Sequence, residues 1–135
     1  EINGFSYDVN YCQYTYPNET DALNFGEASL TLGYDFKVVA VSAKYYVGVS
    51  TNDTNPEDGY EASLSVPITA VDATLDATYG DYDNVGNYYS IGATKSFKKF
   101  DITLAYTGMD YDNNNAGHDN DGSEDNVVAT ISTSF

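Results

Sequence analysis

Apolar residues alternate with polar ones on both sides of three tight turns, and this period of two constrains the fold more than any other feature. Each turn places two residues between an apolar pair, as in Phe36-Lys37-Val38-Val39. A two-residue hairpin loop puts its flanking residues opposite each other on one face of a sheet, so counting by twos assigns every residue to a face. The other two turns are Ile68-Thr69-Ala70-Val71 and Phe97-Lys98-Lys99-Phe100.

The count gives three hairpins with one apolar face and one face of small and polar residues. On the apolar face, Lys95 alone interrupts the series with a charge. The apolar series are Ala28, Leu30, Leu32, Tyr34 and Phe36 with Val39, Val41, Ala43, Tyr45, Val47 and Val49; Tyr60, Ala62, Leu64, Val66 and Ile68 with Val71, Ala73, Leu75, Ala77 and Tyr79; and Tyr89, Ile91, Ala93, Lys95 and Phe97 with Phe100, Ile102, Leu104 and Tyr106.

Two further alternating segments, 5–11 and 127–135, bring the expected strands to an even number, eight. Outer-membrane barrels have short periplasmic turns, long extracellular loops and both termini on the periplasmic side. The chain therefore predicts an all-β fold: an antiparallel up-and-down transmembrane β-barrel with eight strands, as one domain over 1–135. The longer connections, rich in Asp, Asn and Gly and opposite the tight turns, are 17–24, 50–58, 80–87 and 109–124.

A soluble β-sandwich shows the same alternation, with the apolar faces of two sheets packed in a dry core. Here the polar face carries Ser, Thr, Gly, Asp and Glu with almost no Lys, which suits the interior of a narrow barrel. The apolar faces also end in aromatic residues, which gather at the two interfaces of a bilayer. We therefore favour the barrel, and a secreted sandwich, adhesive or stabilised by calcium, is the alternative. The expected girdles are Phe36, Phe97, Phe100 and Phe135 at the tight turns and Tyr11, Tyr60, Tyr79, Tyr89 and Tyr106 toward the long connections.

Five segments carry a resemblance that runs in order across nearly the whole chain. They are Tyr11-Cys12-Gln13-Tyr14-Thr15-Tyr16-Pro17, Asn24-Phe25-Gly26-Glu27, Val41-Ser42-Ala43-Lys44-Tyr45-Tyr46, Tyr60-Glu61-Ala62-Ser63-Leu64-Ser65-Val66-Pro67 and Tyr88-Tyr89-Ser90-Ile91-Gly92-Ala93-Thr94-Lys95-Ser96-Phe97. They resemble the TorF-type porin family of proteobacteria. The resemblance implies an outer-membrane location and passive transport, with no catalytic or binding residues to carry over. Because members of the family have additional strands before the region similar to residues 1–20, the chain is either a compact eight-stranded member or the C-terminal part of a wider barrel.

The polar face gives the first candidate site, a lumen polar cluster. Lys44 is its only cation, and because unpaired buried charges are costly, we expect it to pair with two or more carboxylates. Such a cluster either fills an eight-stranded barrel or makes a wider pore selective for cations; simple packing and hydration of the interior is the plainer alternative. The expected members are Asp8, Glu27, Asp35, Lys44, Glu61, Asp72, Asp76 and Asp101.

The long connections give the second candidate site. The chain has 21 acidic and 5 basic residues, and most of the acids lie in these connections. Oxygen-rich loops at a cell surface can hold Ca²⁺ loosely, and such cations also bridge lipopolysaccharide phosphates. The spacing lacks EF-hand order, and a solvated acidic loop is the simpler alternative. The candidate ligands are Asp110, Asp112, Asp119, Asp121, Glu124 and Asp125.

Composition also excludes several classes of function. A net charge of -16 excludes duplex nucleic acid as a partner, because phosphate binding needs clustered Lys or Arg. The single histidine, His118, has no neighbouring Ser or Cys nucleophile, so we expect neither enzyme activity nor a resident cofactor. The first residue, Glu1, fits a processed mature form or a trimmed chain. The expected partners are outer-membrane lipid, lipopolysaccharide and, if the lumen is open, small solutes or cations.

Overall fold

The computed structural model describes residues 3–15, 24–49, 56–112 and 122–133. Eight strands form one antiparallel sheet in which each strand pairs with its neighbours in the sequence, as an up-and-down β fold requires. The strands are β1 (Phe5–Tyr14), β2 (Phe25–Asp35), β3 (Ala40–Val49), β4 (Gly59–Ile68), β5 (Ala73–Tyr82), β6 (Gly86–Ser96), β7 (Asp101–Tyr111) and β8 (Ser123–Ser132). None of the described segments forms a helix that is long and apolar enough to cross a membrane.

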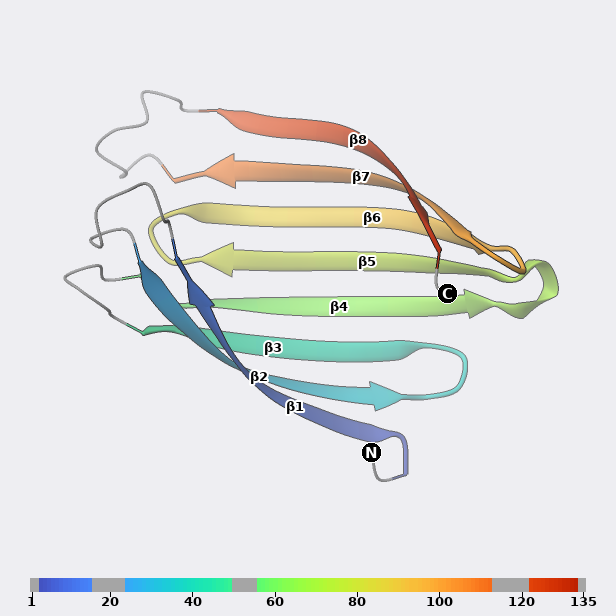
Figure 1. Ribbon diagram of the computed structural model, residues 1–135, viewed down its shortest axis with the longest axis horizontal. Coiled ribbons are helices and arrows are strands. Elements are labelled where there is room, and N and C mark those ends of the chain that lie inside the picture. The colour runs from blue at the N-terminus through green and yellow to red at the C-terminus, as the bar shows by residue number, and fades with distance from the viewer. Residues whose placement is uncertain (1–2, 16–23, 50–55, 113–121, 134–135) are drawn as a thin grey trace.

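The sheet is strongly curved, with β1 and β8 at its two edges (Figure 1). Tyr82 of β5 donates a hydrogen bond to Glu27 of β2 at 3.2 Å, although two strands lie between them. Neighbouring strands stand about 4.8 Å apart, so these two strands would be about 14 Å apart in a flat sheet. The face that carries Glu27 and Tyr82 is therefore concave, and we call it the concave face and its opposite the convex face.

The strand register confirms the predicted division into two faces. One row across all eight strands holds apolar residues on the convex face, and the next row along the strands holds small polar residues on the concave face. The apolar row is Phe5, Tyr34, Val41, Leu64, Ala77, Ile91, Tyr106 and Val127, and the polar row is Ser6, Gly33, Ser42, Ser63, Thr78, Ser90, Thr107 and Asn126.

The strands are also staggered from one edge of the sheet to the other. Phe5, at the start of this apolar row, is the first residue of β1 and lies at the tight-turn end. Val127, at the other end of the same row, lies in the half of β8 that is nearer the long connections. A row of paired residues thus crosses from one end of the strands to the other, which is the offset that accompanies tilted strands in barrels.

Two of the tight turns have the predicted two-residue form. The backbone N–H of Phe36 donates to the carbonyl of Val39 at 2.9 Å, and that of Phe97 donates to Phe100 at 2.9 Å. Phe36 and Phe97 therefore stay on the apolar side at the end of their strands, as the count by twos requires.

The prediction for the second turn is wrong in length. Residues Thr69–Val71 form a 3₁₀ turn, and Asp72 follows with a left-handed φ of 47°. Together they make a four-residue loop. Ile68 consequently pairs with Ala73 and not with Val71. Because the loop is two residues longer than predicted, the assignment of faces along β5 is unchanged. Asp72, however, lies in this loop and is exposed, so its placement in the lumen polar cluster is wrong.

The connection predicted over 80–87 is also shorter than expected. β5 continues to Tyr82 and β6 begins at Gly86, and the N–H of Val85 donates to the Tyr82 carbonyl at 3.0 Å. Asn84 and Gly86, with φ of 59° and 137°, supply the positive φ that this compact reversal needs. The Asn and Gly residues that indicated a long loop instead close a tight hairpin.

The described residues do not enclose a dry apolar core. Tyr46 is the one large apolar side chain among them that is buried, with 1% of its surface exposed. The sandwich alternative needs two packed sheets, and the described strands form one sheet with its apolar face uncovered. The exposed fractions of representative convex residues are Phe36 55%, Val41 37%, Leu64 43%, Leu75 45% and Ile131 73%.

Candidate functional site

An ion pair between β2 and β3 lies on the concave face. The ammonium nitrogen of Lys44 is 3.8 Å from Oε1 of Glu27, and the two side chains are 32% and 12% exposed. Lys44 also stands over the ring of Tyr46, 5.0 Å from its centroid. Glu27 is the one carboxylate in the described part of the chain within ion-pair distance of Lys44, so the prediction of two or more partners is wrong there.

Glu61 of β4 lies opposite Lys44 in the register but takes different partners. Its Oε2 accepts a hydrogen bond from the hydroxyl of Tyr88 at 2.8 Å, and its Oε1 accepts one from Ser63 at 3.4 Å. Neutral hydroxyl donors thus stabilise this carboxylate in place of a second contact with the lysine.

Three tyrosines connect these charged groups, and the sequence analysis did not single them out as site residues. The rings of Tyr46 and Tyr82 lie 4.6 Å apart between centroids, and those of Tyr82 and Tyr88 lie 6.1 Å apart. The hydroxyl oxygens of Tyr46 and Tyr88 are 3.3 Å apart, and Tyr82 donates to Glu27 at 3.2 Å. Together with Glu27, Lys44 and Glu61 these rings form one connected polar and aromatic network across β2–β6.

Glycines on the neighbouring strands make room for these rings. Gly59 lies opposite Tyr46 and Gly80 lies opposite Tyr88. A Cβ atom at Gly59 would be 2.3 Å from Cε2 of Tyr46, and one at Gly80 would be 2.2 Å from Cζ of Tyr88. The rings therefore lie over bare glycine backbone, an arrangement known from designed and natural sheets. Tyr–Gly pairs across strands were the sequence signal that could have revealed the network.

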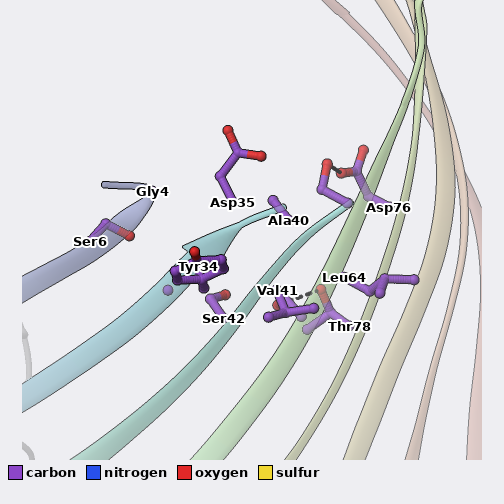
Figure 2. A pocket seen from close by; sticks show the side chains of 13 residues that line it. Gly4, Ser6, Tyr34, Asp35, Ala40, Val41, Ser42, Leu64, Asp76 and Thr78 are labelled. Atoms are coloured by element: carbon purple, nitrogen blue, oxygen red, sulfur yellow. Dashed lines mark hydrogen bonds between the residues drawn. The ribbon is translucent and has the colours of Figure 1, made fainter. Parts of the chain in front are cut away.

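Two other predicted lumen residues line a cavity of about 520 Å³ at the tight-turn end of the concave face. Figure 2 shows Asp35 and Asp76 at one end of this cavity, with Ser42 and Thr78 further along the strands. Oδ1 of Asp76 accepts a hydrogen bond from Ser65 at 2.7 Å. Oδ2 of Asp35 pairs at 3.8 Å with Lys37, whose side chain is 82% exposed, so this pair stands in water and is weak.

The last two predicted members also lie on the concave face, but apart from the network. Asp8 is opposite Thr31 on the edge strand β1 and is exposed, and Asp101 is opposite Ser96 near the tight turns. The predicted cluster is thus a series of carboxylates spread along one face, and only Glu27, Lys44 and Glu61 of it are drawn together.

The predicted divalent-cation loop is only partly described. Asp119 and Asp121 lie outside the described residues. Glu124 pairs with Met109 on the concave face, whereas Asp125 pairs with Gly108 on the convex face, so strand alternation separates these two carboxylates. Asp110 lies near the end of β7 and Asp112 lies just beyond it, and both are exposed. Within the described ranges, no group of three or more His, Cys, Asp or Glu side chains is placed to hold a metal ion.

On the convex face, four tyrosine hydroxyls at the long-connection end donate to polar side chains. Tyr11 donates to Gln13 at 2.7 Å, Tyr45 to Asp58 at 3.1 Å and Tyr89 to Asp125 at 2.6 Å. Tyr79 donates to Asn87 in the same way. An apolar ring on the convex surface with a satisfied hydroxyl is the arrangement that suits a boundary between an apolar medium and water.

Two members of the second predicted girdle, Phe97 and Phe100, lie together at the tight-turn end of the convex face. The rings of Phe97 and Phe100 stack at 4.8 Å between centroids, and both side chains are exposed. The ammonium group of Lys95 reaches the Val71 carbonyl in the neighbouring turn, so its stem crosses the apolar face while its charge meets polar groups. Phe135, the fourth predicted member of this girdle, lies outside the described residues.

No family model, curated protein or solved structure matches this chain. The resemblance to TorF-type porins therefore stays a prediction. What the structure shows is an all-β chain whose eight antiparallel strands follow one another in a single curved sheet with an apolar convex face and a polar concave face.

Proposed function

We propose that this chain is an outer-membrane β-barrel of a Gram-negative bacterium, with a narrow porin-like lumen that favours small cations. The observation that carries the proposal is that the two faces are the reverse of those in a soluble protein. Large apolar side chains are exposed on the convex face, while Ser, Thr, Gly and charged side chains line the concave face. A soluble protein rarely leaves so large an apolar surface in water. Lipid acyl chains are the medium in which such a surface is stable.

Closure of the sheet by pairing β1 with β8 completes the proposal. β1 and β8 run antiparallel to each other, since they are the first and last of eight alternating strands. Every residue of both strands is exposed, which leaves two long unpaired edges. Closure removes such edges, and the stagger of the register supplies the offset that tilted barrel strands need.

The charge of the concave face supports a preference for cations. Its described carboxylates outnumber the single lysine, Lys44, and a passage lined by one sign of charge concentrates counter-ions. These carboxylates are Asp8, Glu27, Asp35, Glu61, Asp76, Asp101 and Glu124. A purely structural surface barrel that passes no ions is the second candidate.

Membrane integration is the first test of this function. We expect the protein to leave the membrane fraction only in detergent, and to migrate on gels as a compact form until it is heated. After refolding into planar bilayers, a salt gradient should give a reversal potential of cation-selective sign. Absence of ion flux from pure folded protein would favour the structural barrel, and a monomer that stays in solution without detergent would contradict the proposal altogether.

A further inference from the structure

The concave face is divided along its length by the network of tyrosines and charges. We define the tyrosine septum as Tyr46, Tyr82 and Tyr88 with Glu27, Lys44 and Glu61. On its tight-turn side lies the cavity of about 520 Å³ that Asp35 and Asp76 line. On its long-connection side lies a second cavity of about 480 Å³, with Phe25 and Glu57 in its lining.

The order of residues along β3 and along β5 places the septum between the two cavities. On β3, Ser42 lines the first cavity, and Lys44 and Tyr46 come next toward the long connections. On β5, Thr78 lines the first cavity and Tyr82 lines the second, with Gly80 between them. Tyr46 is the most buried of the large side chains here, so the space between the cavities is filled.

We propose that the tyrosine septum is the barrier to ion flow through the lumen, with a water-filled vestibule on each side. The inference rests on the proposed function, because only a closed barrel makes the concave face a passage. The three rings lie 4.6 and 6.1 Å apart between centroids, and in a closed barrel we expect them to leave no open water path. The hydroxyl of Tyr82 donates to Glu27 and that of Tyr88 donates to Glu61, so the groups that would block the lumen also hold two of its charges at the septum.

The packing of the septum explains why truncation should open it. Gly59 and Gly80 lie beneath the rings of Tyr46 and Tyr88 and contribute no side chain of their own. Loss of a ring therefore leaves a gap over bare backbone, which neighbouring side chains on these strands do not fill. The gap would be lined by Glu27, Glu61 and backbone, and water and small cations would enter it.

The test compares three variants in planar bilayers containing KCl: Tyr46→Ser, Tyr88→Ser and, as a matched control, Tyr79→Ser. Tyr79 lies on β5 but on the convex face, with 46% of its surface exposed. We expect small currents for the wild type and the control, and a several-fold rise in conductance with stronger cation selectivity for both septum variants. Unchanged conductance in correctly folded septum variants would overturn the septum while leaving membrane insertion intact.

A labelling experiment keeps the inference testable if conductance is hard to resolve. In a Cys12→Ser background, Ser63→Cys places a thiol in the tight-turn vestibule, since Ser63 lines that cavity. A small cationic thiol reagent added to intact cells should label it slowly with the septum present and rapidly after Tyr46→Ser or Tyr88→Ser. Equal labelling rates with and without the septum substitution would contradict the inference. A chain that stays in solution without detergent would instead contradict the proposed function. Heat-dependent gel migration of each variant confirms that the barrel has formed.

Discussion

Replacing Leu64 by arginine should lower the stability of the membrane-folded protein by about 2–4 kcal/mol, the cost of a cationic side chain at the middle of the lipid face of a barrel. Leu64 lies in the middle of β4 on the convex face and is 43% exposed. The guanidinium would stand in acyl chains, too deep for its side chain to reach either interface easily. Urea unfolding of the protein refolded in lipid vesicles measures the change in free energy.

Ile68→Arg is the matched control, because Ile68 lies on the same strand and the same face, next to the turn at Thr69. Near an interface the same change should cost only about 0–1 kcal/mol. If the convex face stood in water instead, both substitutions would replace exposed side chains and change stability by no more than about 0.5 kcal/mol. Equal and small effects at the two positions would therefore contradict the account.

Replacing Gly86 by alanine should destabilise the fold by about 2 kcal/mol or more, since backbone strain and overpacking each cost about 1–3 kcal/mol. Gly86 has φ of 137°, which L side chains rarely adopt. A Cβ there would also be 2.0 Å from the carbonyl oxygen of Asp110, which is backbone and cannot rotate away. The β5–β6 hairpin closes at this residue, so we expect slower and less complete refolding as well.

Gly92→Ala on the same strand is the control for the general effect of adding a methyl group to β6. Gly92 is not one of the described glycines with a positive φ. A Cβ added to it would be 3.2 Å from the Cβ of Ala105, which is a tight contact with a small side chain. We expect this variant to stay within about 1 kcal/mol of the wild type, because the gain from restricting the unfolded chain offsets the tight contact. The same unfolding assay in vesicles compares the two, and similar losses at Gly86 and Gly92 would show that the positive φ is not the cause.

The division into faces could be predicted from the sequence because the period of a strand is two and a tight turn fixes its phase. The faces of Phe36 and Phe97 follow from two residues between an apolar pair, and the register confirms them. The faces along β5 are also as predicted despite the wrong length of the turn at Thr69–Val71, because an error of two residues preserves the phase.

Other features depended on backbone conformation or on contacts between distant strands, which the alternation does not encode. The tight hairpin at Asn84 and Gly86 needs a positive φ at these two residues. The composition of residues 80–87 alone predicted a long loop there. The contact of Tyr82 with Glu27 joins strands that are not neighbours and exists only because the sheet curves. Among the described residues Lys44 pairs with one carboxylate and not with two or more, because Glu61 accepts a hydrogen bond from the hydroxyl of Tyr88, which a count of charges ignores.

The central claim is that the convex face meets lipid, and nitroxide scanning along β4 tests it most directly. In a Cys12→Ser background, single cysteines at 62–66 carry a spin label in turn, and collisions with oxygen and with a water-soluble nickel complex are measured in vesicles. Oxygen is enriched in the bilayer, so we expect it to reach labels at Ala62, Leu64 and Val66 more readily than the nickel complex does. Labels at Ser63 and Ser65, which line the cavity on the concave face, should show the opposite preference. A label at Leu64 that meets nickel freely, or that meets neither reagent because it lies in a dry core, would contradict the account.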